Sequence, residues 1–256
     1  MAQQAMPVRR ARLGRTFGPE PSSVSGVVLL LPAGDENSTR KPSPLLAAAS
    51  VHALGRRLAR AGRTEGLAAH VVHYRCRGWN GGEANLAHDA GWAADEVVRR
   101  YGDVPVCLVG FGMGGRAALH AGGHDAVNSV LAIAPWLPKE DAATPPEPVK
   151  QLAGRRVMVV HGTNDERVDP ALSFRFAARA KKTNPDICRF EVHSDRHGLQ
   201  QHRDEVHALA EDFVMGVLFG RAFARPVVDA LAAPPPLGLR MPLASGFGRA
   251  RSRRGV

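Results

Sequence analysis

The sequence has few cysteines and aromatic residues and no long apolar run. Aromatic side chains make up 5% of its 256 residues, and its three cysteines, Cys76, Cys107 and Cys188, are odd in number and scattered. This pattern excludes a disulfide framework and fits a reducing compartment. No stretch approaches the roughly 18 consecutive apolar residues of a membrane span, and the basic residues of 1–23 are not followed by a signal-peptide-like apolar run. We therefore expect a cytoplasmic protein.

Acidic residues are scarce near both ends of the chain. The net charge is +10, and residues 1–24 and 221–256 supply nine of these charges through eleven arginines and two acids. Residues 25–220 are nearly neutral, so nucleic acid or a membrane is an unlikely partner except through the basic tails. Both tails lack a periodic apolar pattern, and the second contains PPP at 234–236. We expect both tails to be disordered.

Residues 25–220 alternate short apolar runs with longer amphipathic segments. Runs rich in Val, Leu and Ile predict strands at 26–32, 68–75, 105–110, 126–135, 155–162 and 186–193. The segments between and after them predict helices at 43–62, 83–102, 114–121, 169–182 and 200–220. This order predicts one α/β domain with a mostly parallel sheet and helices on both faces. The linker 136–154 is too short and too rich in proline to form a cap domain.

The segment VCLVGFGMGGRAAL, residues 106–119, has two alternative interpretations. Its glycines, Gly110, Gly112 and Gly115, match the Gly-x-Gly-x-x-Gly pattern of dinucleotide-binding loops. Such a loop needs an acidic residue after the next strand to bind the ribose hydroxyls. Here the next strand ends AIAPW, and no acid appears until Glu140. We therefore expect no nucleotide or other cofactor.

The same segment resembles the nucleophile elbow of the α/β-hydrolases, Gly-x-Ser-x-Gly, with Gly112 at the serine position. Two later loops resemble the rest of the catalytic set, in the family's chain order of nucleophile, acid and base. VVHGTNDERVDP, residues 159–170, places Asp165 at the acid position, and FEVHSDRHGL, residues 190–199, places His197 at the base position. The resemblance covers about residues 25–220. It implies an α/β-hydrolase fold without a cap domain, similar to small bacterial esterases, and the Ala-, Arg- and Gly-rich composition is typical of a high-GC bacterium.

The resemblance also implies a role for each of these positions. Asp165 would accept a hydrogen bond from one nitrogen of His197, so that the other nitrogen can take a proton. An oxyanion would be held by the backbone N–H of Met113 and by that of Ala33 or Gly34.

Other residues near these loops leave alternatives open. Phe111 and Trp79 are expected to line a pocket, although Trp79 could equally pack on the body of the domain. Glu166 or Asp195 could replace the acid, and His193 or His202 the base. His161 is interpreted as a structural hydrogen-bonding residue.

The nucleophile itself is missing, because Gly112 has no side chain. Cys107 and Ser129 lie within predicted strands and are interpreted as core residues. His202 and His207 are five residues apart, which does not place them on one helix face, so we predict no metal site.

We expect a relative of ester and acyl hydrolases that is impaired as a serine hydrolase and binds a small molecule. One alternative is an enzyme in which the His197–Asp165 pair acts as general base. The other is association with nucleic acid or a membrane through the tails. The sequence does not define an oligomeric state.

Overall fold

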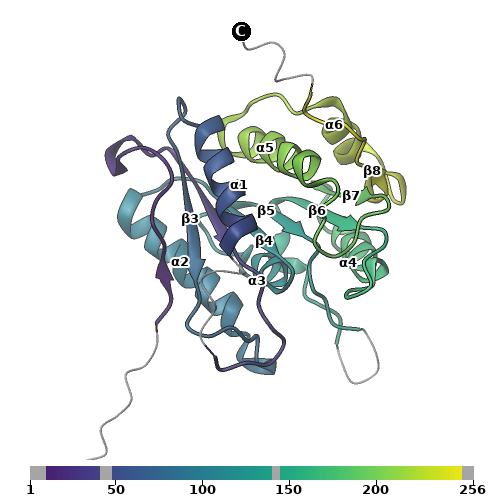
Figure 1. The fold of residues 1–256 in the computed structure, drawn as a ribbon, viewed down its shortest axis with the longest axis horizontal. Coiled ribbons are helices and arrows are strands. Elements are labelled where there is room, and N and C mark those ends of the chain that lie inside the picture. Colours follow the sequence, from purple (N-terminus) through teal and green to yellow (C-terminus); the bar gives the residue numbers. More distant parts are fainter. Residues whose placement is uncertain (1–9, 41–47, 140–144, 250–256) are drawn as a thin grey trace, which may run out of the picture.

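The chain folds around an eight-stranded sheet with the order β1-β3-β2-β4-β5-β6-β7-β8 (Figure 1). The computed structural model describes residues 10–40, 48–139 and 145–249. Only β1 and β3 pair antiparallel, and the other neighbours are parallel. The strands are β1 Arg12–Leu13, β2 Gly26–Leu31, β3 Leu67–His73, β4 Val106–Phe111, β5 Val127–Ile133, β6 Arg156–Gly162, β7 Ile187–Val192 and β8 Met241–Pro242. This sheet, with its covering helices, has the expected α/β-hydrolase architecture.

The sheet has a hydrophobic core on each face. Along β2, Val27, Leu29 and Leu31 pack into one core, and Val28 and Leu30 pack into the other. Alternate side chains of a strand point to opposite faces, so this continuous apolar run fills both cores.

Within the described residues, three helices cover each face of the sheet. Side chains of α2, α3 and α4 belong to the first core, and those of α1, α5 and α6 belong to the second. Figure 1 shows α1 and α5 side by side. The helices are α1 Ala48–Ala61, α2 Asn85–Tyr101, α3 Met113–Ala121, α4 Pro170–Lys181, α5 Arg203–Phe219 and α6 Arg225–Ala232. None of the helices among the described residues is both long and apolar enough to cross a membrane.

The prediction that the C-terminal segment 221–256 is disordered is wrong over most of that segment. Helix α6 buries Val227 in the second core, and β8 pairs with β7. The backbone N–H of Leu243 donates to Glu191 O at 2.9 Å. The eight-residue helix and two-residue strand are too short to show the periodicity on which the prediction relied. Residues 250–256 lie outside the described residues.

Part of the predicted N-terminal tail, 1–24, also contributes to the sheet. Strand β1 pairs with β3, and Phe17 forms a further bridge with Ala69. Two-residue pairing of this kind leaves no alternation of apolar and polar residues to read from the sequence. Residues 1–9 lie outside the described residues, as do 41–47 at the start of the helix predicted at 43–62.

Four parallel strands place their loops at one edge of the sheet. Strands β4, β5, β6 and β7 end at Phe111, Ile133, Gly162 and Val192, and their carboxyl ends point the same way. In open parallel sheets, ligands bind at this edge. The three loops that resemble a catalytic set follow β4, β6 and β7. The described part of the linker 136–154 contains a single short 3-10 helix, Lys150–Leu152.

Candidate active site

The turn from β4 into α3 is a sharp elbow with Gly112 at its apex. Gly112 has φ 53° and ψ −119°, a conformation that side-chain-bearing residues rarely adopt. The neighbouring glycines allow close backbone approach. A Cβ on Gly110 would lie 2.1 Å from Gly114 O, and one on Gly114 would lie 2.3 Å from Leu31 O. The glycines of this segment therefore allow a tight crossing of strand and helix.

The elbow points toward His197. An ideal Cβ built on Gly112 would lie 3.8 Å from His197 Nε2 and 3.5 Å from Ala33 Cβ. The peptide of Gly112 is fixed on both sides, because its N–H donates to Ile133 O at 3.0 Å and its carbonyl accepts from the Trp136 N–H at 2.9 Å. A side chain at this apex would therefore face the imidazole without a steric clash.

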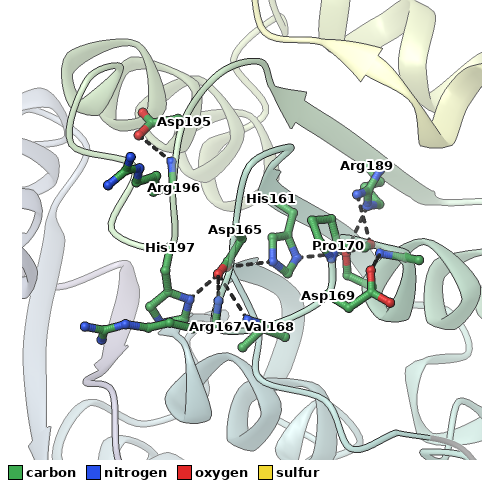
Figure 2. A network of polar contacts seen from close by, with 12 residues as sticks. His161, Asp165, Arg167, Val168, Asp169, Pro170, Arg189, Asp195, Arg196 and His197 are labelled. Atoms are coloured by element: carbon green, nitrogen blue, oxygen red, sulfur yellow. Dashed lines mark hydrogen bonds and ion pairs between the residues drawn. The ribbon is translucent and has the colours of Figure 1, made fainter.

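Asp165 and His197 are hydrogen-bonded, as Figure 2 shows. His197 Nδ1 donates to Asp165 Oδ2 at 2.8 Å, and the backbone N–H groups of Arg167 and Val168 donate to Oδ1 at 2.9 and 3.1 Å. The side chain of Asp165 has no exposed surface, whereas that of His197 is 26% exposed. The carboxylate thus orients the imidazole through Nδ1, and Nε2 faces the pocket.

A second histidine holds Asp165 from the opposite side. His161, which is fully buried on β6, donates from Nε2 to Asp165 Oδ2 at 3.0 Å, and its Nδ1 lies 2.9 Å from Ser173 Oγ. Arg189 Nε donates to the same Ser173 Oγ at 3.0 Å. His161 is the hydrogen-bonding residue expected from the sequence, and it connects the acid to a buried arginine (Figure 2).

The direction of these hydrogen bonds follows from the protonation states. Burial is the largest effect on Asp165 and opposes its ionisation, but the hydrogen bonds from His161 and His197 outweigh it and lower its pKa well below the usual range. Burial lowers the pKa of His161, so this ring is neutral at pH 7. The Ser173 hydroxyl donates to Pro170 O at 3.0 Å and also lies within hydrogen-bonding distance of His161 Nδ1. The two histidine rings and the backbone N–H groups of Arg167 and Val168 thus all donate to a charged Asp165.

A pocket of about 150 Å³ opens above the elbow. Its apolar lining includes Phe111, as expected, together with Ile133, Leu199 and Val206. Its polar and titratable lining consists of His197, Gln200, Arg203 and His207.

Trp79 does not line this pocket; it packs on the body of the domain, which is the alternative that the sequence left open. The indole is buried, lies 4.8 Å from the ring of His120 and carries the guanidinium of Arg116 at 3.9 Å from its ring centroid. Arg116 also pairs with Glu147 at 2.6 Å. Trp79 therefore packs against α3 and helps to hold the segment that contains Glu147. These contacts join residues far apart in the sequence, which gives no local signal for them.

The predicted oxyanion donors differ in position. Met113 is the first residue of α3, where a backbone N–H has no intrahelical acceptor, and Ala33 lines the pocket beside the apex. Gly34 instead approaches Arg77 O and Leu86, where a Cβ would lie 2.6 Å from each, and it is not part of the pocket lining.

The alternative nucleophiles and acids lie away from the apex. Cys107 and Ser129 are buried partners on β4 and β5, and burial raises the pKa of the Cys107 thiol to about 12. Glu166 is exposed. Asp195 accepts from the backbone N–H of His202 at 3.0 Å and from its Nδ1 at 3.2 Å.

From the sequence, Arg203 was not considered and His207 was considered only as a possible metal ligand, and both line the pocket. They are four residues apart on α5, and this spacing places two side chains on one helix face. The spacing in the sequence could therefore have indicated that the two side chains lie together. Among the described residues, no group of three His, Cys, Asp or Glu side chains could hold a metal ion.

Comparison with known proteins agrees with the fold. The sequence profile of the prolyl oligopeptidase family matches residues 134–215. This segment contains Asp165 and His197 but begins after the elbow. No curated protein sequence matches the chain.

Solved structures of similar fold are α/β-hydrolases and esterases. A putative alpha/beta hydrolase from Agrobacterium tumefaciens is 17% identical with a TM-score of 0.58, covering 84% of this chain and 94% of that one. Est1E from Butyrivibrio proteoclasticus, solved with ferulic acid bound, is 14% identical with a TM-score of 0.57, covering 81% and 94%. An alpha-beta serine hydrolase homologue from Coxiella burnetii is 16% identical with a TM-score of 0.54, covering 82% and 100%. At these identities the likeness establishes the α/β-hydrolase fold.

Proposed function

We propose that this α/β-hydrolase-fold protein binds a small molecule in the pocket above Gly112 and forms no covalent acyl-enzyme. The observation that carries the proposal is the direction of the apex: a Cβ on Gly112 would lie 3.8 Å from His197 Nε2, where a serine hydroxyl would meet its base. Glycine supplies no such hydroxyl. The chain therefore retains the shape of a hydrolytic site without its nucleophile.

The remaining site residues fit the roles of the missing reaction. In this proposal Asp165 occupies the acid position and His197 the base position, and the Met113 and Ala33 N–H groups would face a ligand oxygen. Est1E, of similar fold, binds ferulic acid, an aromatic carboxylic acid. A compact ligand with a polar oxygen end is consistent with the size of the pocket and its lining.

A second candidate function follows from the intact pair of Asp165 and His197. Their hydrogen bond of 2.8 Å leaves Nε2 facing the pocket, and no described residue is hydrogen-bonded to that nitrogen. The pair could act as a general base that activates water or removes a substrate proton. This activity would need no group at position 112.

Labelling with a fluorophosphonate probe tests the main proposal. The wild-type protein should show no adduct by intact mass spectrometry, because the probe requires an activated serine oxygen. Gly112→Ser should take up one probe molecule, and His197→Ala in that background should abolish the adduct. Stoichiometric labelling of the wild-type protein would identify another serine as the nucleophile and refute the proposal.

A further inference from the structure

One end of the pocket is formed by polar side chains at the start of α5. Arg203 and His207 lie one helical turn apart, Gln200 precedes the helix, and all three line the pocket. No aspartate or glutamate is present in the lining. The apolar part of the lining includes Phe111 and Leu199. The pocket therefore has a cationic, hydrogen-bonding end and a hydrophobic wall.

His207, at this end of the pocket, is buried and has no hydrogen-bonding partner among the described residues. It is 7% exposed. Native proteins rarely leave a buried polar side chain without a partner, because its lost hydration is then not replaced. Since the ring also lines the pocket, a pocket occupant can hydrogen-bond to it.

The charges around His207 favour an anion. Arg203 is exposed at the pocket and forms no ion pair within the described part of the chain, whereas Arg57, behind His207, is paired with Glu211 at 2.7 Å. Asp204 is the acidic neighbour, but it is exposed and does not line the pocket. Burial, followed by the charges of Arg57 and Arg203, lowers the pKa of His207 to about 4. The ring is therefore neutral at pH 7 and can donate one N–H.

The volume limits the rest of the ligand. A pocket of about 150 Å³ is the size of an engineered protein cavity that binds benzene. A single unpaired guanidinium balances one negative charge. The occupant should therefore be small and singly charged, with an apolar body.

We propose that the pocket takes a small aromatic monocarboxylate, with its carboxylate on Arg203 and His207 and its ring against Phe111. This inference rests on the proposed function, because it names the ligand class of the same pocket. The carboxylate accepts one hydrogen bond from the guanidinium and one from the imidazole. The ring lies toward the elbow and His197.

Calorimetry at pH 7 with benzoate and benzamide tests the charge requirement. Benzoate should bind about tenfold more tightly than its neutral analogue, because hydrogen bonds to a charged acceptor are the stronger kind. Phenyl phosphate, a dianion of similar ring size, should bind more weakly than benzoate. Equal binding of benzoate and benzamide, or tighter binding of phenyl phosphate, would overturn the proposed ligand class.

Variants locate the carboxylate. Arg203→Gln should weaken benzoate binding about five- to tenfold and leave benzamide binding unchanged. Arg175→Gln, on the exposed face of α4, is the matched control and should change neither. His207→Leu should weaken benzoate binding, and His207→Gln, which keeps an N–H donor, should restore part of it. Benzoate affinity that is unchanged in both Arg203→Gln and His207→Leu would overturn the inference.

The Gly112→Ser variant separates this inference from the proposed function. If neither ring compound binds but Gly112→Ser gains esterase activity, the site is intact and the ligand class is wrong. If Gly112→Ser is inactive as well, the proposed function fails with it. In an active Gly112→Ser, benzoate should inhibit competitively, and Arg203→Gln should weaken that inhibition.

Discussion

Replacing Gly112 by serine should create a reactive hydroxyl at the elbow. The Cβ position lies 3.8 Å from His197 Nε2, and the bond from Cβ to Oγ can be turned toward that nitrogen. The hydroxyl would then reach the hydrogen-bonding distance of about 2.6–3.2 Å that a general base requires. Asp165 already holds the ring in place at 2.8 Å. No other residue has to move for the contact to form.

The same change should also cost stability, and the structure indicates how much. The nearest non-neighbouring atom to the new Cβ is Ala33 Cβ at 3.5 Å, an ordinary contact, so the cost comes from the backbone and not from crowding. A side chain held at φ 53° costs about 1–3 kcal/mol. For a domain of this size, that corresponds to a fall of roughly 2–12 °C in Tm. Gly112→Ala carries the same backbone strain without the hydroxyl and is the matched control.

Hydrolysis of p-nitrophenyl acetate measures the gain. Removing the serine of a working triad costs about a millionfold in kcat, so even a small fraction of a triad's rate stands above the background of Gly112→Ala. His197→Ala in the serine background should return the rate to that background.

Two results would refute this reasoning. A Gly112→Ser protein that is folded, yet no more active than Gly112→Ala and not labelled by a fluorophosphonate, would mean that the apex does not present its side chain to His197. An unchanged Tm in both variants would mean that the conformation at 112 carries no strain for a side chain.

Three other changes test the groups behind the elbow. Asp165→Asn should lower the free energy of unfolding at pH 7 by about 1–3 kcal/mol, and the difference from wild type should shrink in acid, because the lowered pKa of Asp165 gives stability that is present above pH 4 and lost as it is protonated; a constant difference in denaturant titrations would contradict this. His161→Phe in the Gly112→Ser background should reduce kcat more than KM, since His161 positions Asp165 and does not touch the pocket; an effect on KM alone would argue against a positioning role. His207 has a folded pKa of about 4 against 6.5 in the unfolded chain, so wild-type stability should fall as pH decreases from 6.5 to 4, by about 3 kcal/mol, and His207→Gln should remove that part of the slope; an identical slope in the variant would show that His207 is not buried neutral.

The sequence was sufficient for the central sheet and for the three loops at its edge. Strands such as β2 and β5 are continuous apolar runs, and such runs reveal a strand that is buried on both faces. The loops around Gly112, Asp165 and His197 follow such strands directly, so their order along the chain also predicted their meeting in space. The distance of 2.8 Å between Asp165 and His197 is consistent with that order.

The sequence was insufficient where structure depends on distant partners. Strand β8 consists of two residues, and the segment before it is tied to β7 by Arg189, which donates to Leu239 O at 2.9 Å. The position of Trp79 depends on its contact with Arg116, which lies on another element. No local sequence pattern links these two residues. Short elements and single long-range contacts of this kind carry no period that a sequence pattern could show.

Gly112 has no side chain, so the space beside His197 Nε2 is open to a ligand or to water. What occupies that space distinguishes the two candidate functions, ligand binding and general-base catalysis. In a serine hydrolase, the serine hydroxyl fills this space and acts as the nucleophile. Here the nitrogen faces an open pocket that Ala33 also lines. A benzoate held by Arg203 and His207, with its ring toward His197, would exclude from this space the water that a general base needs. Benzoate should therefore suppress any activity that depends on His197 as a base, and binding and catalysis at this pocket should compete with each other.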